Sequence, residues 1–463
     1  MIDFSALAGK YETPLYVYDL DLIKKRFLAY KEAFSGRKSL ICYALKANSN
    51  LSILRAIARL GGGADCVSIG EVRRAILAGI KPYRIIFSGV GKRDSEIKEA
   101  LELGILFINV ESHQELLRVE AIARILDTQA RISIRVNPNI DPKTHPYIST
   151  GLSENKFGVE LEEAKKMYLY AHKSSALQPI GVHFHIGSQL TELDPITQSA
   201  HKIADFTRAL LALKIDIRFF DIGGGVGICY EEETPIDLYT YAQSILSALG
   251  GLDLTIICEP GRSIVGESGY LITQVLYEKH TQNKRFVIVD AAMNDLLRPS
   301  LYNAYHRIRV LKESSKDSSE ARAGESKEGA SSAVSKADVV GPICESGDFL
   351  AKGVELSRLD SGDLLVLENA GAYGYSMSSN YNTRPRCAEV GVEAGKILLL
   401  KRRERFEDMV ADELELLEQN EVAGCDEVGC KMASYEVSGE LSGGVPDSGA
   451  CRRDAKADLE GES

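Results

Sequence analysis

Residues 40–68 read LICYALKANSNLSILRAIARLGGGADCVS, and this stretch contains the unit from which the fold can be predicted. A short apolar run at 40–44 leads into a helix-length segment at 50–60, and a second apolar run follows at 64–68. Two strands joined by a helix are expected to pair in parallel through a right-handed crossover. The first strand ends beside Lys46, a lysine that burial statistics alone would place in solvent.

Similar apolar runs recur through the first 260 residues. The eight predicted strands are residues 40–44, 64–68, 84–88, 106–110, 132–136, 181–186, 218–222 and 254–258. Eight strands that alternate with helix-length segments predict closure into a (β/α)8 barrel of the TIM type over residues 24–266. An open doubly wound sheet is the alternative, but no GxGxxG motif follows the first strand.

The pattern changes after the barrel. The strand-like runs there are residues 286–290, 339–343, 364–367 and 390–400. No regular helices separate these runs, which predicts a C-terminal β domain over residues 267–410. The LYVY run at 15–18 precedes the first barrel helix, so residues 1–23 are expected to add a strand to the same β domain.

Two segments differ in composition from the rest of the chain. Residues 312–336 are rich in Ser, Ala, Lys and Glu and contain a single branched apolar residue, Val334. Such a segment cannot bury enough apolar area to offset its ordering entropy, so a disordered insertion is predicted. Residues 411–463 form an acidic tail, which is expected to be disordered beyond a possible short helix at 412–418.

Charge, hydrophobicity and cysteine content argue against several classes of protein. The chain has a net charge of −11, but residues 407–463 hold 16 acidic and 4 basic side chains, so the body is nearly neutral. Neither part predicts binding to nucleic acid or to an anionic membrane. No apolar run reaches the roughly 18–20 residues that span a bilayer, and no secretory signal is recognised. Nine scattered cysteines favour free thiols in the cytoplasm.

The polar residues of the first half gather where a barrel places its active site, at the carboxyl ends of the strands. The predicted strands end on or near Lys46, Ser68, His185, the glycines 223–225 and Glu259, with Asp65, Ser188, Gly261 and Arg262 close by. A lysine, an imidazole, a glycine loop, a carboxylate and an arginine are therefore expected at one mouth of the barrel.

The glycine loop predicts an anion site. DIGGGVG, residues 221–227, follows an apolar strand, and its glycines let backbone N–H groups approach an anion. A tight structural turn is the alternative for this motif alone. CEPGR, residues 258–262, again places a glycine at a strand end and adds the Arg262 guanidinium, which favours a ligand that carries a phosphate.

The two histidines of GVHFHIGSQ, residues 181–189, share one face of a strand. A zinc ion could use such a pair, but no third ligand has matching spacing, so no metal is predicted. A buried structural histidine is one interpretation of this pair. His185 lies nearer the mouth than His183 and could stack on an aromatic cofactor.

Glu259 and Lys46 complete the prediction of a cofactor. A carboxylate beside a phosphate site is unfavourable unless a positive group lies between them, and a protonated pyridine nitrogen is such a group. Lys46 can form a Schiff base with an aldehyde. Together these groups predict pyridoxal 5′-phosphate, which acts as an electron sink.

Seven motifs, taken together and in this order, resemble the diaminopimelate decarboxylase family. They are YALKAN, HFHIGSQ, DIGGGVGI, CEPGR, LRPSLYNAYH, GPICESGDFL and GAYGYSMSSNYNTRPR. The resemblance covers roughly residues 10–311 and 338–411. It implies a pyridoxal-phosphate enzyme with an alanine racemase-like fold, a barrel plus a β domain.

The resemblance also implies roles for individual residues. Lys46 would form the Schiff base, His185 would stack on the ring, and Glu259 would pair with the pyridine nitrogen. The other implied cofactor-binding residues are Asp65, Ser188, Gly224, Gly225, Pro260, Gly261, Arg262 and Tyr373. Substrate binding is implied for Arg262, Arg298, Tyr302, Glu345 and Tyr373.

The implied reaction is decarboxylation of meso-2,6-diaminopimelate to L-lysine and CO2, the last step of lysine biosynthesis. Cys344 would be the proton donor after CO2 is lost, and Glu345 would bind the distal ammonium group. In the family the CES segment of one subunit completes the site of its partner, which implies a homodimer with shared active sites.

Four alternatives are open at this point. Another decarboxylase of the same fold could act on ornithine, arginine or carboxynorspermidine, but Arg298 and Glu345 argue against a diamine-pathway enzyme. An alanine racemase of this class places arginine, not a carboxylate, against the pyridine nitrogen. A non-catalytic protein that binds the cofactor would have no use for Cys344. A Schiff-base aldolase without the cofactor would not need Glu259.

Overall fold

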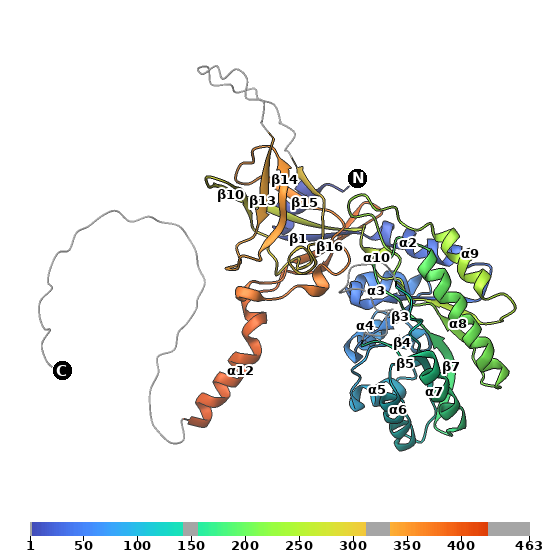
Figure 1. The fold of residues 1–463 in the computed structure, drawn as a ribbon. Coiled ribbons are helices and arrows are strands. Elements are labelled where there is room, and N and C mark those ends of the chain that lie inside the picture. The colour runs from blue at the N-terminus through green and yellow to red at the C-terminus, as the bar shows by residue number, and fades with distance from the viewer. Residues whose placement is uncertain (1, 142–155, 312–333, 425–463) are drawn as a thin grey trace, which may run out of the picture. The chain divides into compact units, whose positions relative to one another are not determined.

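The computed structural model describes residues 2–141, 156–311 and 334–424 of the 463-residue chain (Figure 1). A closed barrel of eight parallel strands forms the first part. Its strands are β2 (Ser39–Ala44), β3 (Gly63–Cys66), β4 (Ile85–Phe87), β5 (Phe107–Val110), β6 (Ala130–Arg135), β7 (Leu177–His183), β8 (Phe219–Asp221) and β9 (Thr255–Cys258). Each strand pairs in parallel with its sequence neighbours, and β2 pairs with β9 to close the ring. The predicted barrel is confirmed.

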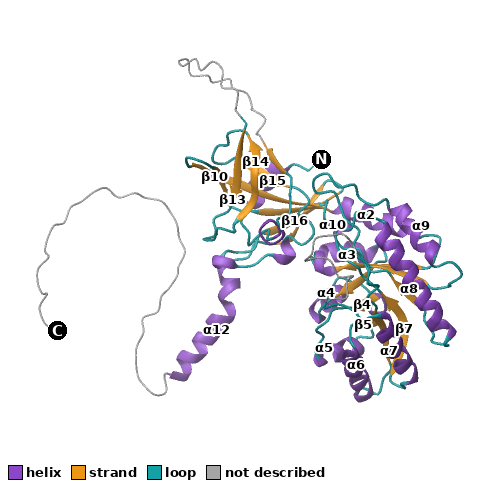
Figure 2. Ribbon diagram, viewed as in Figure 1, coloured by secondary structure: helices purple, strands orange, loops and turns teal. Residues whose placement is uncertain are grey.

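Helices surround the barrel (Figure 2). They are α2 (Leu20–Ala33), α3 (Leu51–Arg59), α4 (Ile69–Leu77), α5 (Asp94–Glu102), α6 (His113–Ile125), α7 (Leu161–Lys173), α8 (Asp194–Ala212), α9 (Leu238–Ala248) and the short α10 (Arg262–Val265). Polar side chains begin several of them: the Asn50 side chain accepts the backbone N–H of Ser52 at the start of α3. Ser68 caps α4 in the same way, so this serine is a helix cap and does not line the cavity described below.

The barrel interior changes character along its axis. Six apolar side chains form a separate cluster, Cys42, Ile86, Leu106, Phe107, Ile180 and Ile257. Nearer the carboxyl ends of the strands, buried polar side chains take over, among them Asp65, Asn109, His183 and Asp221. Buried polar groups need partners, so this end of the barrel is where binding or catalysis is expected.

A nine-stranded sheet forms the second part. Its strands are β1 (Leu15–Asp19), β10 (Gly269–His280), β11 (Arg285–Val289), β12 (Ile308–Leu311), β13 (Ser335–Val340), β14 (Phe349–Leu356), β15 (Leu364–Leu367), β16 (Ala388–Glu393) and β17 (Lys396–Lys401). The N-terminal strand β1 lies between β10, to which it is antiparallel, and β16, to which it is parallel. The short helices α1 (Phe4–Tyr11) and α11 (Arg298–Tyr302) accompany this sheet in the chain.

Some predicted boundaries are wrong. Strand β7 begins four residues before the predicted 181–186, because Pro179 within it is a poor sequence signal for a strand. The predicted strand 390–400 is the hairpin β16–β17, which turns at Ala394 and Gly395, both with positive φ.

The two segments of unusual composition are only partly described. The predicted insertion 312–336 extends too far, because Ser335 and Lys336 belong to β13; residues 312–333 lie outside the described residues. The expected helix at 412–418 lies within α12 (Phe406–Gly424), which continues past residue 418 where disorder was expected. Residues 425–463 lie outside the described residues.

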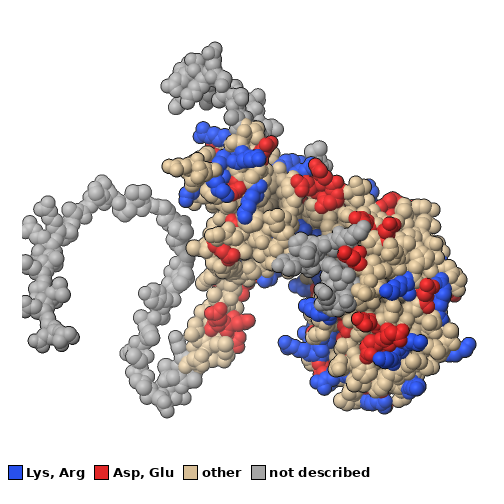
Figure 3. Space-filling view, in the orientation of Figure 1, with Lys and Arg blue, Asp and Glu red and all other residues tan. Residues whose placement is uncertain are grey.

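The barrel and the nine-stranded sheet belong to one compact unit, Met1–Met409, and Val410–Ser463 form a second unit. Domain boundaries at residues 23, 266 and 410 stay a prediction. On the visible face of the barrel, acidic and basic side chains are interspersed (Figure 3). Among the described helices, none is long and apolar enough to span a membrane.

Candidate active site

A cavity of about 360 Å³ opens at the carboxyl ends of the barrel strands. Ten of the predicted site residues line it: Lys46, His185, Ser188, Gly225, Glu259, Gly261, Arg262, Arg298, Tyr302 and Tyr373. Other lining residues were not predicted, and they include Phe157, Gln189, Tyr230 and Glu233. The barrel and the β-sheet part of the chain therefore contribute to one site.

The turn after β2 places Lys46 in this cavity. The backbone N–H of Ala44 donates to the Pro260 carbonyl at 3.1 Å, and the N–H of Tyr373 donates to the Ala47 carbonyl at 2.8 Å. These bonds tie the Lys46 turn to the CEPGR loop and to the C-terminal part of the chain. The Lys46 side chain is 38% exposed, as expected for an amine that opens into a cavity.

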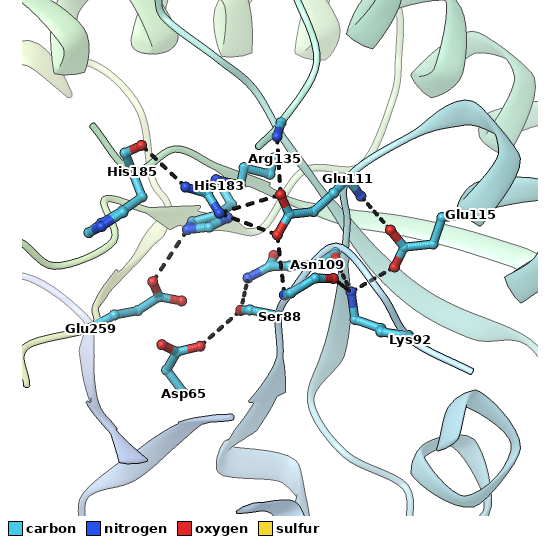
Figure 4. A network of polar contacts seen from close by, with 12 residues as sticks. Asp65, Ser88, Lys92, Asn109, Glu111, Glu115, Arg135, His183, His185 and Glu259 are labelled. Carbon is cyan, nitrogen blue, oxygen red and sulfur yellow. Dashed lines mark hydrogen bonds and ion pairs between the residues drawn. The ribbon is translucent and has the colours of Figure 1, made fainter. Parts of the chain in front are cut away.

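Asp65 holds the Lys46 amine. Lys46 Nζ donates to Asp65 Oδ2 at 3.1 Å, and Ser88 Oγ donates to Asp65 Oδ1 at 2.8 Å. Asn109 in turn donates to Ser88 Oγ at 3.0 Å, so a buried polar chain supports the carboxylate (Figure 4). Burial disfavours the charged amine, but attraction to Asp65 outweighs it, and the pKa of Lys46 is raised.

His185 lies two residues beyond β7 and contributes its ring to the cavity wall. The Gly224 N–H donates to His185 Nδ1 at 3.2 Å, which orients the ring. Burial, and then the nearby charges of Arg135 and Lys46, hold the pKa of His185 well below its ordinary value. A neutral ring fixed in this way suits stacking against an aromatic cofactor.

Three glycines leave the backbone open where a ligand is expected. A Cβ atom at Gly224 would lie 2.1 Å from the Glu259 carbonyl oxygen, and one at Gly225 would lie 2.3 Å from the Gly187 carbonyl oxygen. At Gly261 the nearest atom would be the Ala47 Cβ at 3.0 Å. The close approach of these backbone segments therefore requires glycine at the first two positions.

Arg262 supplies the positive charge beside this cradle. Its guanidinium donates to Tyr230 Oη at 2.7 Å and to Ser188 Oγ at 3.1 Å. The side chain is buried, and its Nε has no hydrogen-bond partner among the described residues. Arg262 forms no ion pair with a carboxylate in the described part of the chain, and such a buried guanidinium is suited to bind an anion.

Glu259 brings a negative charge to the same cavity. Its Oε2 lies 3.3 Å from Nε2 of His183, while its buried Oε1 has no partner within the described part of the chain. Burial disfavours the ionised form, but His183 and Lys46 outweigh it, and the pKa of Glu259 falls to about 2. An unpaired, ionised oxygen at a cavity wall calls for a cation or a donor in the ligand.

Asp221 explains how two carboxyl groups share this small space. The pKa of Asp221 is well above its ordinary value because of burial and then the charge of Glu259. Asp221 is therefore the more readily protonated of the two carboxyl groups, and Glu259 the more acidic. Ligand atoms of His183, Asp221 and Glu259 lie within 4.8 Å of one another, a composition that also fits a metal site. The folded chain therefore brings two further possible ligands to His183, which the spacing in the sequence did not predict.

Arg298 brings a second buried guanidinium to the cavity. Its Nη1 lies 2.8 Å from Nε2 of His306, and its guanidinium carbon lies 4.5 Å from the centre of the Tyr230 ring. Sequence reasoning missed Tyr230 and His306. His306 ends the quoted motif LRPSLYNAYH and could have been found there, whereas Tyr230 has no such signal.

Five predicted residues take other positions. Asp65 and Gly224 lie behind the wall and contact Lys46 and His185, and Pro260 contributes a carbonyl to the Ala44 bond. Cys344 and Glu345 are exposed and do not line the cavity. The Cys344 N–H donates to Asn382 Oδ1 at 3.1 Å. One chain by itself therefore does not bring the CES segment to Lys46.

Comparison with known proteins agrees with this geometry. Residues 20–266 match the pyridoxal binding domain of the pyridoxal-dependent decarboxylases. Diaminopimelate decarboxylase of Helicobacter pylori strain J99 is 60% identical over 418 residues, which cover 90% of this chain and 100% of the relative. The chain belongs to the diaminopimelate decarboxylase family.

Other members of the family support this assignment. The Campylobacter jejuni diaminopimelate decarboxylase is 55% identical over 417 residues, 90% of this chain and 100% of that protein. The crystal structure of the H. pylori diaminopimelate decarboxylase complexed with L-lysine has a TM-score of 0.83 and 59% identity, and covers 89% of this chain and 100% of that one. The predicted fold and the pyridoxal-binding domain are confirmed, which argues against an aldolase that works without the cofactor.

Proposed function

We propose that this chain decarboxylates meso-2,6-diaminopimelate to L-lysine and CO2, with pyridoxal 5′-phosphate bound in the barrel cavity. One observation carries the proposal: Lys46, His185, Glu259 and Arg262 line one cavity, and Arg298 adds a second buried guanidinium to it. Arg262 would serve the cofactor and help to hold a carboxylate, and Arg298 is the additional charge for the substrate. A decarboxylase for an amino acid with two carboxylates needs this second charge.

The residues present fit the cofactor. Glu259 Oε1 and Arg262 Nε are buried polar atoms without partners among the described residues, one negative and one positive. They match a protonated pyridine nitrogen and a phosphate respectively, and Lys46 lies in the same cavity to bind the aldehyde. The bound cofactor would supply the sink for the electron pair that remains when CO2 leaves.

The protein's own residues would orient the reaction. Asp65 holds the Lys46 amine, the neutral His185 ring gives a flat wall, and Glu259 holds its negative charge against the cofactor. Arg298 would bind the distal carboxylate of the substrate and so decide which bond is presented for cleavage. Ornithine lacks this carboxylate and would leave the buried Arg298 unpaired.

The proposal includes a homodimer whose sites are shared. Support comes from the positions of Cys344 and Glu345, which are exposed and away from the cavity of their own chain. A second copy that presents this segment would supply the proton donor and a carboxylate for the distal ammonium group. The proposal places the enzyme in the cytoplasm, where free thiols such as those of the six described cysteines persist.

The test is CO2 release by the purified, cofactor-loaded protein. The substrates to compare are meso-, LL- and DD-diaminopimelate, ornithine and arginine. We expect release from the meso isomer and little from the others. Release from ornithine or arginine alone would contradict the assignment of Arg298 and would favour a diamine-pathway decarboxylase.

A further inference from the structure

Two buried guanidinium groups share the cavity, and neither forms an ion pair with a carboxylate of the described residues. Arg262 is 7% exposed and Arg298 is 6% exposed. Neutral side chains that contact them include Tyr230, Tyr373, Ser188 and His306. Buried like charges repel, so each guanidinium must be held in place by neutral partners until an anion binds.

Tyr230 separates the two guanidinium groups. Its hydroxyl oxygen accepts from Arg262 Nη1 at 2.7 Å, while its ring face meets the Arg298 guanidinium at 4.5 Å. The Arg262 guanidinium is farther from the same ring centre, at 5.8 Å. One tyrosine thus binds one arginine through its hydroxyl and the other through its π face.

His306 holds Arg298 from the remaining side. It is 2% exposed, and its Nδ1 lies 2.9 Å from the Glu368 carbonyl oxygen. A carbonyl oxygen can only accept, so Nδ1 carries the hydrogen and Nε2 keeps its lone pair. That lone pair accepts from Arg298 Nη1 at 2.8 Å. The His306 ring also packs edge-on against Tyr230, with ring centres 5.6 Å apart.

The charge state of His306 follows from the same geometry. A cationic imidazole would point a donor and a positive charge at the guanidinium. Burial, and then Arg298 itself, lower the pKa of His306 to about 3, so the ring is neutral at any pH at which the protein would be used. The acceptor is therefore permanently available.

We propose that His306 is a positioning residue for substrate recognition, because it fixes the Arg298 guanidinium at the angle needed to receive a carboxylate. This inference rests on the proposed function and assigns the ligand class: an amino acid that carries a second carboxylate. One N–H of Arg298 is used by His306, and Arg262 is held separately by Tyr230. Each arginine thus has its own neutral partner and keeps further N–H groups for an anion.

Three variants of His306 test this role. His306→Gln keeps an acceptor, His306→Phe removes it, and His306→Glu replaces it with an internal counter-ion for Arg298. We expect the Gln variant to keep KM for meso-diaminopimelate within about threefold of the parent value. We expect KM to rise about tenfold or more in the Phe and Glu variants, with kcat changed much less, as for the loss of one hydrogen bond to a charged group.

The readouts separate positioning from loss of fold. The visible absorbance of the bound cofactor and its binding affinity should be unchanged in all three variants, because His306 does not touch the cofactor-binding set. His280→Phe is the matched control, since His280 is 64% exposed on β10 and should leave KM unchanged. If the Phe variant does not fold, the isosteric Gln and Glu variants still give the comparison.

Two outcomes would overturn the inference. Equal KM values for the Gln and Phe variants would show that the acceptor at 306 does not set the substrate site. A fall in kcat with unchanged KM would assign His306 to another step. Absence of CO2 release by the unaltered enzyme is a different result, because it would reject the proposed function and not the role of His306.

Discussion

The carboxyl groups of Glu259 and Asp221 show how neighbouring residues shift the pKa values of this site. Burial and the charge of Glu259 raise the pKa of Asp221, whereas His183 and Lys46 outweigh burial and lower the pKa of Glu259, although the two carboxyl groups share one buried cluster with His183. The cluster thereby presents its more acidic carboxyl group, that of Glu259, where the cofactor nitrogen is proposed to bind.

Asp221→Asn should stabilise the cofactor-free protein at neutral pH. The ordinary pKa of this carboxyl is 3.8, and the folded value is much higher. Above about pH 4 the unfolded chain releases the proton and the folded chain keeps it, so Asp221 costs more stability as pH rises. Asparagine mimics the protonated form without this cost. We expect Tm to rise by a few degrees at pH 8, with a smaller gain at about pH 5.

Asp216→Asn is the control for this experiment, because the Asp216 side chain is 67% exposed and pairs with Arg218 at the surface. It should leave Tm nearly unchanged at both pH values. A Tm gain for Asp221→Asn that is equal at both pH values, or a loss that grows with pH, would contradict the raised pKa of Asp221.

Lys46→Ala should abolish both cofactor attachment and activity. Lys46 is the amine in the cavity wall that Asp65 holds, and removal of a covalent catalytic group typically costs roughly a thousandfold or more in rate. The measurements are the visible absorbance of the purified protein and CO2 release. Lys38→Ala, at an exposed surface pair with Asp253, should retain both. A coloured, active Lys46→Ala protein would reject the site.

At the scale of elements, the two strands that flank the predicted insertion, β12 and β13, pair with other strands of the sheet and not with the insertion. β12 pairs with β15, and β13 pairs with β11 and β14, so neither depends on residues 312–333 for its register. The H. pylori relative is covered over its whole length by 90% of this chain. Catalysis in the family therefore does not require every residue of the present chain.

Replacing residues 312–333 by a short Gly/Ser linker should leave kcat and KM within about twofold, because the site residues lie on other segments. Activity assays and thermal unfolding of the purified variant check this. A deletion that continues through Ser335 and Lys336 should lower Tm, since both residues pair with β14. Loss of activity in the shorter deletion, with the fold intact, would assign a role to the segment.

At the scale of the whole molecule, the exposed Cys344 segment makes one chain incomplete for the proposed reaction. The barrel supplies the cofactor groups, and α11 with its following loop supplies Arg298 and His306. The cavity of the same chain lacks Cys344 and Glu345. Two chains that exchange this segment would each complete the other.

Mixing two inactive variants tests this exchange. Lys46→Ala and Cys344→Ala should each have very low activity alone. Unfolded and refolded together, or co-expressed, they should form mixed dimers with one intact site and recover about a quarter of parental activity. A double variant that carries both substitutions is the control and should not complement. No recovery in mixed dimers shown to form would reject shared sites.

Much of the cofactor site could be predicted because its residues follow strands. Alternating strands and helices require parallel pairing, and parallel strands in a barrel bring Lys46, His185 and Glu259 to one mouth. Local motifs were therefore enough for these positions. The strand ends were predicted less well. The start of β7 was placed too late because Pro179 is a poor strand signal, and the hairpin that turns at Gly395 was predicted as one strand.

The sequence alone determined the barrel, the cofactor and the reaction class, since each depends on short motifs whose order dictates where they meet. Only the tertiary structure decided how the two arginines are kept apart, because Tyr230 and His306 reach them from segments 76 residues apart. It also placed Asp221 beside Glu259 and left Cys344 at the surface. Contacts between segments that are distant in the sequence depend on how the elements pack, and no local pattern of side chains encodes that packing.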